Sequence, residues 1–261
     1  MQSFIQKCRV SCSTKGLCSG LIASTLLLSL LSSCSWTQQT NLGIDTDRSV
    51  QEKTLSLVFE SFEPKGQAEL DRLKQDRTQQ FCSTQRGLKD QSQLTQSTTQ
   101  DQLAEQIRLE NQALITPPKD GNYFGDFKRG ELIAQDGRGK TWSDPSESPS
   151  GGNCYNCHRI SKNELSYGTL GPSLYQFAKL RGINSAKDFA QASQNSSTDP
   201  LIQYTWGVLM NSKAYNVCTV MPRFGVTLNH KTQGHGGPIL NEQQIKDLMS
   251  LLLDPRSPVN E

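Results

Sequence analysis

The stretch GGNCYNCHRI, residues 151–160, constrains this chain most, because it places Cys154, Cys157 and His158 side by side in the sequence. Two cysteines three positions apart with a histidine directly behind them can close a disulfide, hold zinc, exchange electrons as thiols or bind a haem covalently. Each of these chemistries needs a different surrounding fold. The rest of the sequence therefore has to discriminate among them.

The first 33 residues predict a secretory signal peptide. Lys7, Arg9 and Lys15 form a basic start, and an uncharged apolar stretch follows. That stretch is too short and too rich in serine for a membrane-spanning helix. It ends in LSSC, which resembles the lipobox of bacterial lipoproteins. The resemblance implies cleavage before Cys34 and a lipid on its sulfur, with ordinary cleavage a few residues later as the alternative.

Charge gives no case for a nucleic-acid partner. The full chain carries a formal net charge of +2, and loss of the signal peptide removes three positive charges, which leaves −1. A nearly neutral chain does not attract a phosphate backbone. Export instead places the remaining cysteines where disulfides are stable. We therefore expect a periplasmic protein, anchored to a membrane if Cys34 carries a lipid.

The mature chain divides into a polar helical extension, 34–118, and a second domain, 119–261. The extension is rich in glutamine, and its apolar spacing predicts amphipathic helices over 54–62, 68–81 and 101–115. The stretch TPPKDGN then predicts a linker. The sequence shows neither an internal repeat nor βαβ alternation.

The second domain is predicted to be all-α with long loops. Helices are expected over 125–137, 173–180, 199–211 and 241–255. Asn241 and Gln244 have the spacing of a helix-capping pair at the start of the last of these. The stretch GDFKRGELIA resembles the first helix of class I cytochromes c, which implies that Gly130 allows this helix to cross the last one closely. About 140 residues with such loops make a small core, which a cofactor would help to fill.

Three interpretations of CYNCH fit the sequence poorly. A thioredoxin-like CxxC requires a βαβ context that is missing here. A disulfide within the motif would be strained and leaves His158 without a role. Zinc needs four ligands, and the nearest histidines lie 73 or more residues beyond the second cysteine in a polar, glycine-rich loop. The candidates for the two missing zinc ligands are His230 with His235 or Cys82 with Cys218.

Covalent haem attachment uses all three residues of the motif. Cys154 and Cys157 would form thioether bonds, and His158 would be the proximal iron ligand. The following TLGPSL places Pro172 where class I cytochromes c use a proline carbonyl to accept the Nδ1 proton of that histidine. Met221, in the loop VMPRFG 63 residues after the histidine, would supply the sixth ligand.

The remaining cysteines predict one disulfide. Five cysteines follow the signal peptide. If Cys34 carries a lipid and the CxxC pair carries a haem, Cys82 and Cys218 are left to pair with each other. Two unrelated buried thiols are the alternative.

Five segments together resemble the SoxX family, the monohaem cytochrome c subunits of the sulfur-oxidising SoxAX complex. They are GDFKRGELIAQDGRG, GGNCYNCH, ELSYGTLGPSLYQFAKLRG, AYNVCTVMPRFG and LLLDPRSPVN. The similarity runs from about residue 120 to the C-terminus and, more weakly, over PKGQAELDRLKQD. It implies a class I cytochrome c-like domain with one covalent haem c. Its attachment residues would be Cys154 and Cys157, and its axial ligands His158 and Met221. The helical N-terminal extension of this chain is a departure from the family pattern.

The same resemblance implies a role in thiosulfate oxidation, as a subunit of the L-cysteine S-thiosulfotransferase SoxAX. A SoxA-like dihaem or monohaem partner would join thiosulfate to a cysteine of the SoxYZ carrier. This chain would contribute no catalytic residue, but would accept the released electrons and pass them to a diffusible cytochrome. Arg159 and Arg223 are expected to face the redox partner. The alternatives are a stand-alone periplasmic electron carrier and an exported zinc-binding module.

Overall fold

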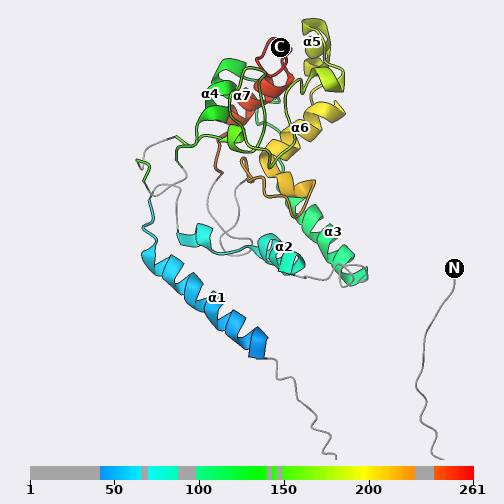
Figure 1. Cartoon of the computed structure of the whole chain (residues 1–261). Helices are drawn as coiled ribbons and strands as arrows, with labels where there is room; N and C mark the ends of the chain where they lie inside the picture. Colours follow the sequence, from blue (N-terminus) through cyan, green and yellow to red (C-terminus); the bar gives the residue numbers. More distant parts are fainter. Residues whose placement is uncertain (1–41, 66–69, 88–97, 140–142, 146–148, 227–237) are drawn as a thin grey trace, which may run out of the picture. The chain divides into compact units, whose positions relative to one another are not determined.

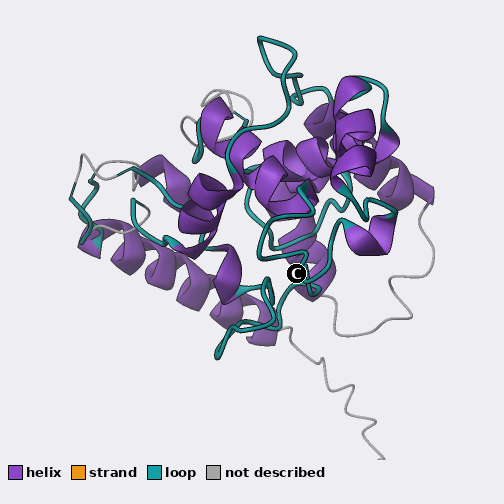
Figure 2. Ribbon diagram, turned by 90° about the horizontal axis from the view of Figure 1, so that it is seen from above, coloured by secondary structure: helices purple, strands orange, loops and turns teal. Residues whose placement is uncertain are grey.

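The computed structural model describes most of the chain beyond residue 41 (Figure 1). The described residues are 42–65, 70–87, 98–139, 143–145, 149–226 and 238–261. They contain helices and loops without a β-strand (Figure 2), which confirms the all-α prediction. Residues 49–261 form one compact unit. The expected signal peptide and Cys34 lie outside the described residues.

Seven α-helices are described. They are α1 (Leu42–Ser61), α2 (Arg77–Gly87), α3 (Thr98–Gln112), α4 (Phe127–Gln135), α5 (Ala186–Gln194), α6 (Pro200–Asn211) and α7 (Glu242–Leu253). Short 3₁₀ turns lie at η1 (Leu70–Leu73), η3 (Cys154–Asn156), η4 (Lys179–Arg181) and η5 (Ser212–Ala214). Within the described part of the chain, no helix combines the length and apolar character needed to cross a membrane.

Helices α4 and α7 cross closely, and they lie side by side in Figure 1. A Cβ atom on Gly130 would overlap the carbonyl group of Asp247 and approach the Cβ of Leu251 to 3.0 Å, so only glycine fits this crossing. Helix α7 begins with the predicted capping box of Asn241 and Gln244. The predicted close contact between the first and last helices of this domain is therefore confirmed.

The buried core extends from α7 to α6 and to the segment before α4. The Trp206 side chain is 2% exposed, and its ring meets the edge of Tyr123 with ring centroids 5.2 Å apart. Its Nε1 donates to the carbonyl oxygen of Thr116 at 2.8 Å. The stretch predicted as a linker is therefore held against α6.

The prediction of a helix over 173–180 is wrong. Turns replace it, and only η4 is helical. Gln176 has a φ of 59°, and its N–H donates to the carbonyl oxygen of Val259 at 2.7 Å. The N–H of Ala178 donates to Oδ1 of Asn260 at 2.9 Å. The C-terminal segment thus takes the backbone donors that a regular helix would have used internally.

The prediction of one helix over 68–81 is also wrong, because the chain breaks between η1 and α2. Asp76 caps α2: its Oδ1 accepts from the N–H of Gln79 at 2.7 Å, and its own N–H donates to Oε1 of Gln79 at 2.9 Å. Such a reciprocal cap starts a new helix. Asp76 is only 5% exposed.

Candidate functional site

The backbone before CYNCH packs against the end of α4. The N–H of Gly152 donates to the carbonyl oxygen of Ile133 at 2.7 Å. A Cβ on Gly151 would overlap the carbonyl group of Asp136. The two glycines therefore let the motif approach the helix end without a side chain in between.

Cys154 begins the 3₁₀ turn η3, which folds the motif back on itself. Its carbonyl oxygen accepts from the N–H of Cys157 at 3.1 Å and from that of His158 at 2.9 Å. Both cysteines are half-buried and lie outside any disulfide, and Cys154 packs against the buried apolar cluster. The turn thus places both cysteines and His158 on one short, folded segment.

The imidazole of His158 is fixed by the segment 171–172. Its Nδ1 lies 2.6 Å from the carbonyl oxygen of Pro172, as the sequence predicts. Because a carbonyl only accepts, Nδ1 must carry the proton, and Nε2 keeps its lone pair for a metal. The N–H of Gly171 donates to the carbonyl oxygen of Cys157 at 2.8 Å, and a Cβ on Gly171 would overlap the imidazole ring.

Met221 lies in the Met221 loop, which we define as residues 218–223 between η5 and Phe224. Its side chain is half-buried and packs against the same apolar cluster as Cys154. The carbonyl oxygen of Met221 accepts from Oγ of Ser212 at 2.8 Å, and its N–H donates to Oγ1 of Thr219 at 3.2 Å. Both predicted sulfur-bearing elements of the site therefore pack on one core. Iron ligation by Met221 stays a prediction.

Cys82 of α2 and Cys218 form a disulfide with an S–S distance of 2.00 Å and Cα atoms 5.3 Å apart. The disulfide joins the two cysteines that the sequence predicts to pair with each other. These two sulfurs are therefore not zinc ligands. His230 and His235 lie outside the described residues, and within the described part of the chain no cluster of three His, Cys, Asp or Glu residues could hold a metal ion.

The expectation that Arg223 faces a redox partner is wrong. Its side chain is 10% exposed and forms a 2.5 Å ion pair with Asp76, whose side chain is 2% exposed. Arg159 is half-buried, and its guanidinium lies 5.4 Å from the ring centroid of Tyr167 and 5.5 Å from that of Tyr175. Sequence reasoning missed Asp76, although its spacing to Gln79 is the pattern of a helix cap.

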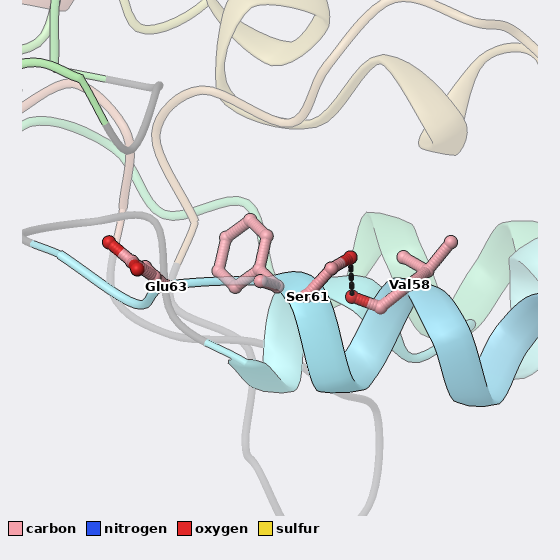
Figure 3. Close-up of a pocket in the computed structure, with 4 residues that line it drawn as sticks. Val58, Ser61 and Glu63 are labelled. Atoms are coloured by element: carbon pink, nitrogen blue, oxygen red, sulfur yellow. Dashed lines mark hydrogen bonds between the residues drawn. The ribbon is translucent and has the colours of Figure 1, made fainter.

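A hollow at the end of α1 does not belong to this site. Its described lining consists of Val58, Ser61, Phe62 and Glu63, and Oγ of Ser61 donates to the carbonyl oxygen of Val58 at 3.3 Å (Figure 3). None of these residues is a cysteine, a histidine or a methionine. The described lining of the hollow therefore offers neither a thioether attachment nor a soft metal ligand.

The donors around η3 suit a haem. Two half-buried thiols flank one turn, the next residue presents an imidazole whose Nδ1 is already engaged, and a thioether packs on the same core. Histidine nitrogen and methionine sulfur are an established axial pair for haem iron. Gly171 and Pro172, which hold the imidazole, lie outside the five-residue motif. A disulfide between Cys154 and Cys157 would not require this support for His158.

No protein-family model matches the chain. Over 157 residues it is 31% identical to a protein of Aquifex aeolicus (strain VF5) described as an uncharacterized lipoprotein. The matched segment covers 60% of this chain and 63% of that protein. The chain therefore spans less than two thirds of the length of this relative.

Proposed function

We propose that this chain is an exported c-type cytochrome that transfers electrons through one covalent haem. The observation that carries the proposal is the 2.6 Å contact between Nδ1 of His158 and the carbonyl oxygen of Pro172, beside two cysteines outside any disulfide. Cys154 and Cys157 would hold the haem, with His158 and Met221 at its iron. When bound, the haem supplies a one-electron couple, whose potential is raised by Met/His ligation.

The chain's own residues would prepare this site in three ways. Pro172 keeps the Nδ1 proton of His158 in place, so that in the neutral ring Nε2 holds the lone pair that would bind iron. Gly171 leaves room for the imidazole ring. The buried apolar cluster against which Cys154 and Met221 pack would keep water from one side of the haem. Charges near the iron would then interact more strongly than they do in water.

The proposal is tested on the purified, oxidised chain. Acid–acetone extraction should leave the colour on the protein, and a pyridine haemochrome spectrum should show two thioether bonds. Extraction of the colour would exclude covalent attachment. Met221→Ala should abolish the weak sulfur-to-iron band at the red edge of the oxidised spectrum and lower the potential. An unchanged spectrum would assign the sixth position to another ligand.

We also propose that Cys34 carries a lipid that anchors the chain to a membrane. The support is the LSSC stretch together with the description of the Aquifex protein as a lipoprotein. The mature chain should fractionate with membranes, and Cys34→Ala should release it. A variant that stays in the membrane fraction would contradict the anchor.

For the electron donor, we propose the reaction of the SoxAX complex, on the basis of the five SoxX-like segments. Joining thiosulfate to a cysteine thiol breaks the S–H bond, forms an S–S bond and releases one proton and two electrons. A one-haem chain would take these electrons singly and hand them to a diffusible cytochrome. The conjugation site would belong to the SoxA-like partner, because Cys82 and Cys218 leave no spare nucleophilic thiol here.

A reconstitution distinguishes this role from that of a stand-alone carrier. The isolated chain should be reducible and reoxidisable, but should not consume thiosulfate in the presence of SoxYZ. Consumption should begin when the SoxA-like partner is added. Turnover by the isolated chain would place a catalytic site in it, whereas a chain that forms no complex with the partner would act as a stand-alone carrier.

A further inference from the structure

The Met221 loop is bonded at both ends to the N-terminal extension. At its start, Cys218 is joined to Cys82 of α2 by the disulfide. At its end, Arg223 is paired with Asp76, the residue that caps α2. Met221 lies between these two anchors, three residues after the first and two before the second. The extension therefore touches the loop on either side of the proposed iron ligand.

The second anchor is buried and held by further hydrogen bonds. One carboxylate oxygen of Asp76 binds Arg223, while the other caps α2 through the N–H of Gln79. Nε of Arg223 donates to Oδ1 of Asn111 in α3 at 3.1 Å. Asn111, 2% exposed, also donates to Oγ1 of Thr78 at 3.3 Å. Each partner of the ion pair is thus fixed by a contact of its own.

The same polar group continues into α6. Nδ2 of Asn211 donates to the backbone carbonyl oxygen of Asn111 at 2.9 Å, and the next residue, Ser212, donates to the carbonyl oxygen of Met221. Movement of α2 or α3 would therefore disturb the Met221 loop through two routes. One runs through Arg223 and the other through Asn111 and α6.

We propose that the extension is a clamp that holds the Met221 loop in place, with Asp76 and Cys82 as positioning residues for the axial ligand. The role of Asp76 and Cys82 in positioning an axial ligand rests on the proposed haem function, whereas the clamp on the loop does not depend on it. A methionine sulfur is a weak, exchangeable ligand, so its occupancy depends on how firmly its loop is held. The clamp gives the polar extension a role that its sequence does not reveal.

The test uses the full mature chain with Asp76→Asn, which keeps a capping side chain but removes the charge that faces Arg223. The matched control is Arg77→Gln on the next residue. This substitution breaks the 2.6 Å ion pair between Arg77 and Glu110, whose side chains are 46% and 31% exposed, respectively. The pair does not involve the Met221 loop. Hydrogen exchange of the 218–223 amides should speed up by about tenfold or more in Asp76→Asn and stay unchanged in the control.

A second readout follows the ligand itself. Added imidazole should compete for the oxidised iron about tenfold more effectively in Asp76→Asn than in the wild type or the control, because a loosened loop surrenders its ligand more easily. If the wild type carries a covalent haem but Asp76→Asn matches the control in both readouts, the clamp is wrong and the haem function stands. If the wild type carries no covalent haem, the haem function fails, and hydrogen exchange alone decides whether the extension holds the loop.

Should Asp76→Asn fail to fold, the folded wild type provides the second test. Dithiothreitol opens the disulfide of Cys82, and exchange should then rise over 218–221 while the amides of α7 stay protected. Equal exchange before and after reduction would refute the clamp.

Discussion

The contact between α4 and α7 and the contact between the extension and the Met221 loop differ in the side chains that form them. Helix α7 packs mainly through an apolar stripe that includes Ile245, Leu248 and Met249, each at most 2% exposed, and one ion pair, Arg129 with Asp247 at 2.8 Å, joins it to α4 as well. The extension instead reaches the Met221 loop through Asp76, Arg223 and one disulfide. Apolar packing tolerates approximate partners, whereas a buried charge needs its counter-charge in one position. We expect the polar contact to be the more brittle of the two.

The largest effect should come from Arg223→Met. It removes the counter-charge of the buried Asp76 carboxylate and one donor to Oδ1 of Asn111, so the free energy of unfolding should fall by about 3–5 kcal/mol. Denaturant unfolding followed by circular dichroism measures this loss. Adding Asp76→Leu to the same chain should recover part of it, because the unpaired charge is then gone. A loss below about 1 kcal/mol in the single variant would break the comparison.

Next in size is Cys82→Ser combined with Cys218→Ser. Without the covalent link the unfolded chain gains freedom, and the free energy of unfolding should drop by about 2–4 kcal/mol. The same unfolding experiment on wild type with its disulfide reduced is the reference. Agreement between the two would attribute the effect to the bond rather than to the new hydroxyl groups.

A smaller loss is expected at the crossing of α4 and α7. Gly130→Val would add a Cβ atom that overlaps the carbonyl group of Asp247 and two methyl groups beyond it, and overpacking of this kind costs about 1–3 kcal/mol. Leu132→Ala on the same helix is the control, because its side chain is 67% exposed and its loss should stay within about 0.5 kcal/mol. If Gly130→Val exceeded the loss in Arg223→Met, the apolar contact would be the brittle one.

The smallest effect concerns Asp120, which lies on the surface near α7. Hydrogen bonds from Nζ of Lys246 at 2.7 Å and from the N–H of Asn122 at 3.0 Å hold the pKa of this carboxyl below its ordinary value. Its stabilising contribution is therefore present above the ordinary pKa and is lost as the pH falls through the lowered one. Asp120→Asn should flatten the acid side of a plot of melting temperature against pH. An unchanged acid limb would show that the contact contributes nothing in solution.

The apolar half of the comparison could be predicted from sequence because its signals are local. The periodic stripe of α7 and the capping pair Asn241 and Gln244 lie within one helix. Gly130 could be singled out only through the resemblance of its segment to the first helix of class I cytochromes c, in which a small residue lets that helix cross the last one. The contact between His158 and Pro172 was found through a family pattern, since a spacing of fourteen residues carries no periodic signal.

The polar half could not be predicted because its signals are distant. Asp76 and Arg223 are 147 residues apart, and each alone looks like a surface charge. The helix expected over 173–180 failed for the same reason, since Val259 and Asn260 take its donors from the far end of the chain. Helix α5 was missed although Ser185 and Asp188 form a capping box, because its apolar stripe is short.

The order of the cysteines along the chain has a consequence for assembly. If the chain is exported as proposed, with its N-terminus first, Cys82 meets oxidants long before Cys218, its partner 136 residues later. Cys154 and Cys157 emerge in between, so they are the first downstream thiols that Cys82 meets. Oxidation in order of emergence would therefore join the wrong sulfurs.

Two routes lead out of this mispairing. Either an isomerase reshuffles a mixed set of bonds, or Cys154 and Cys157 are already occupied when oxidation reaches them. In the second case, occupation of Cys154 and Cys157 would have to precede correct disulfide formation, because only then does the thiol of Cys82 remain reduced until Cys218 arrives. The attachment of the extension would then report that the site had been filled.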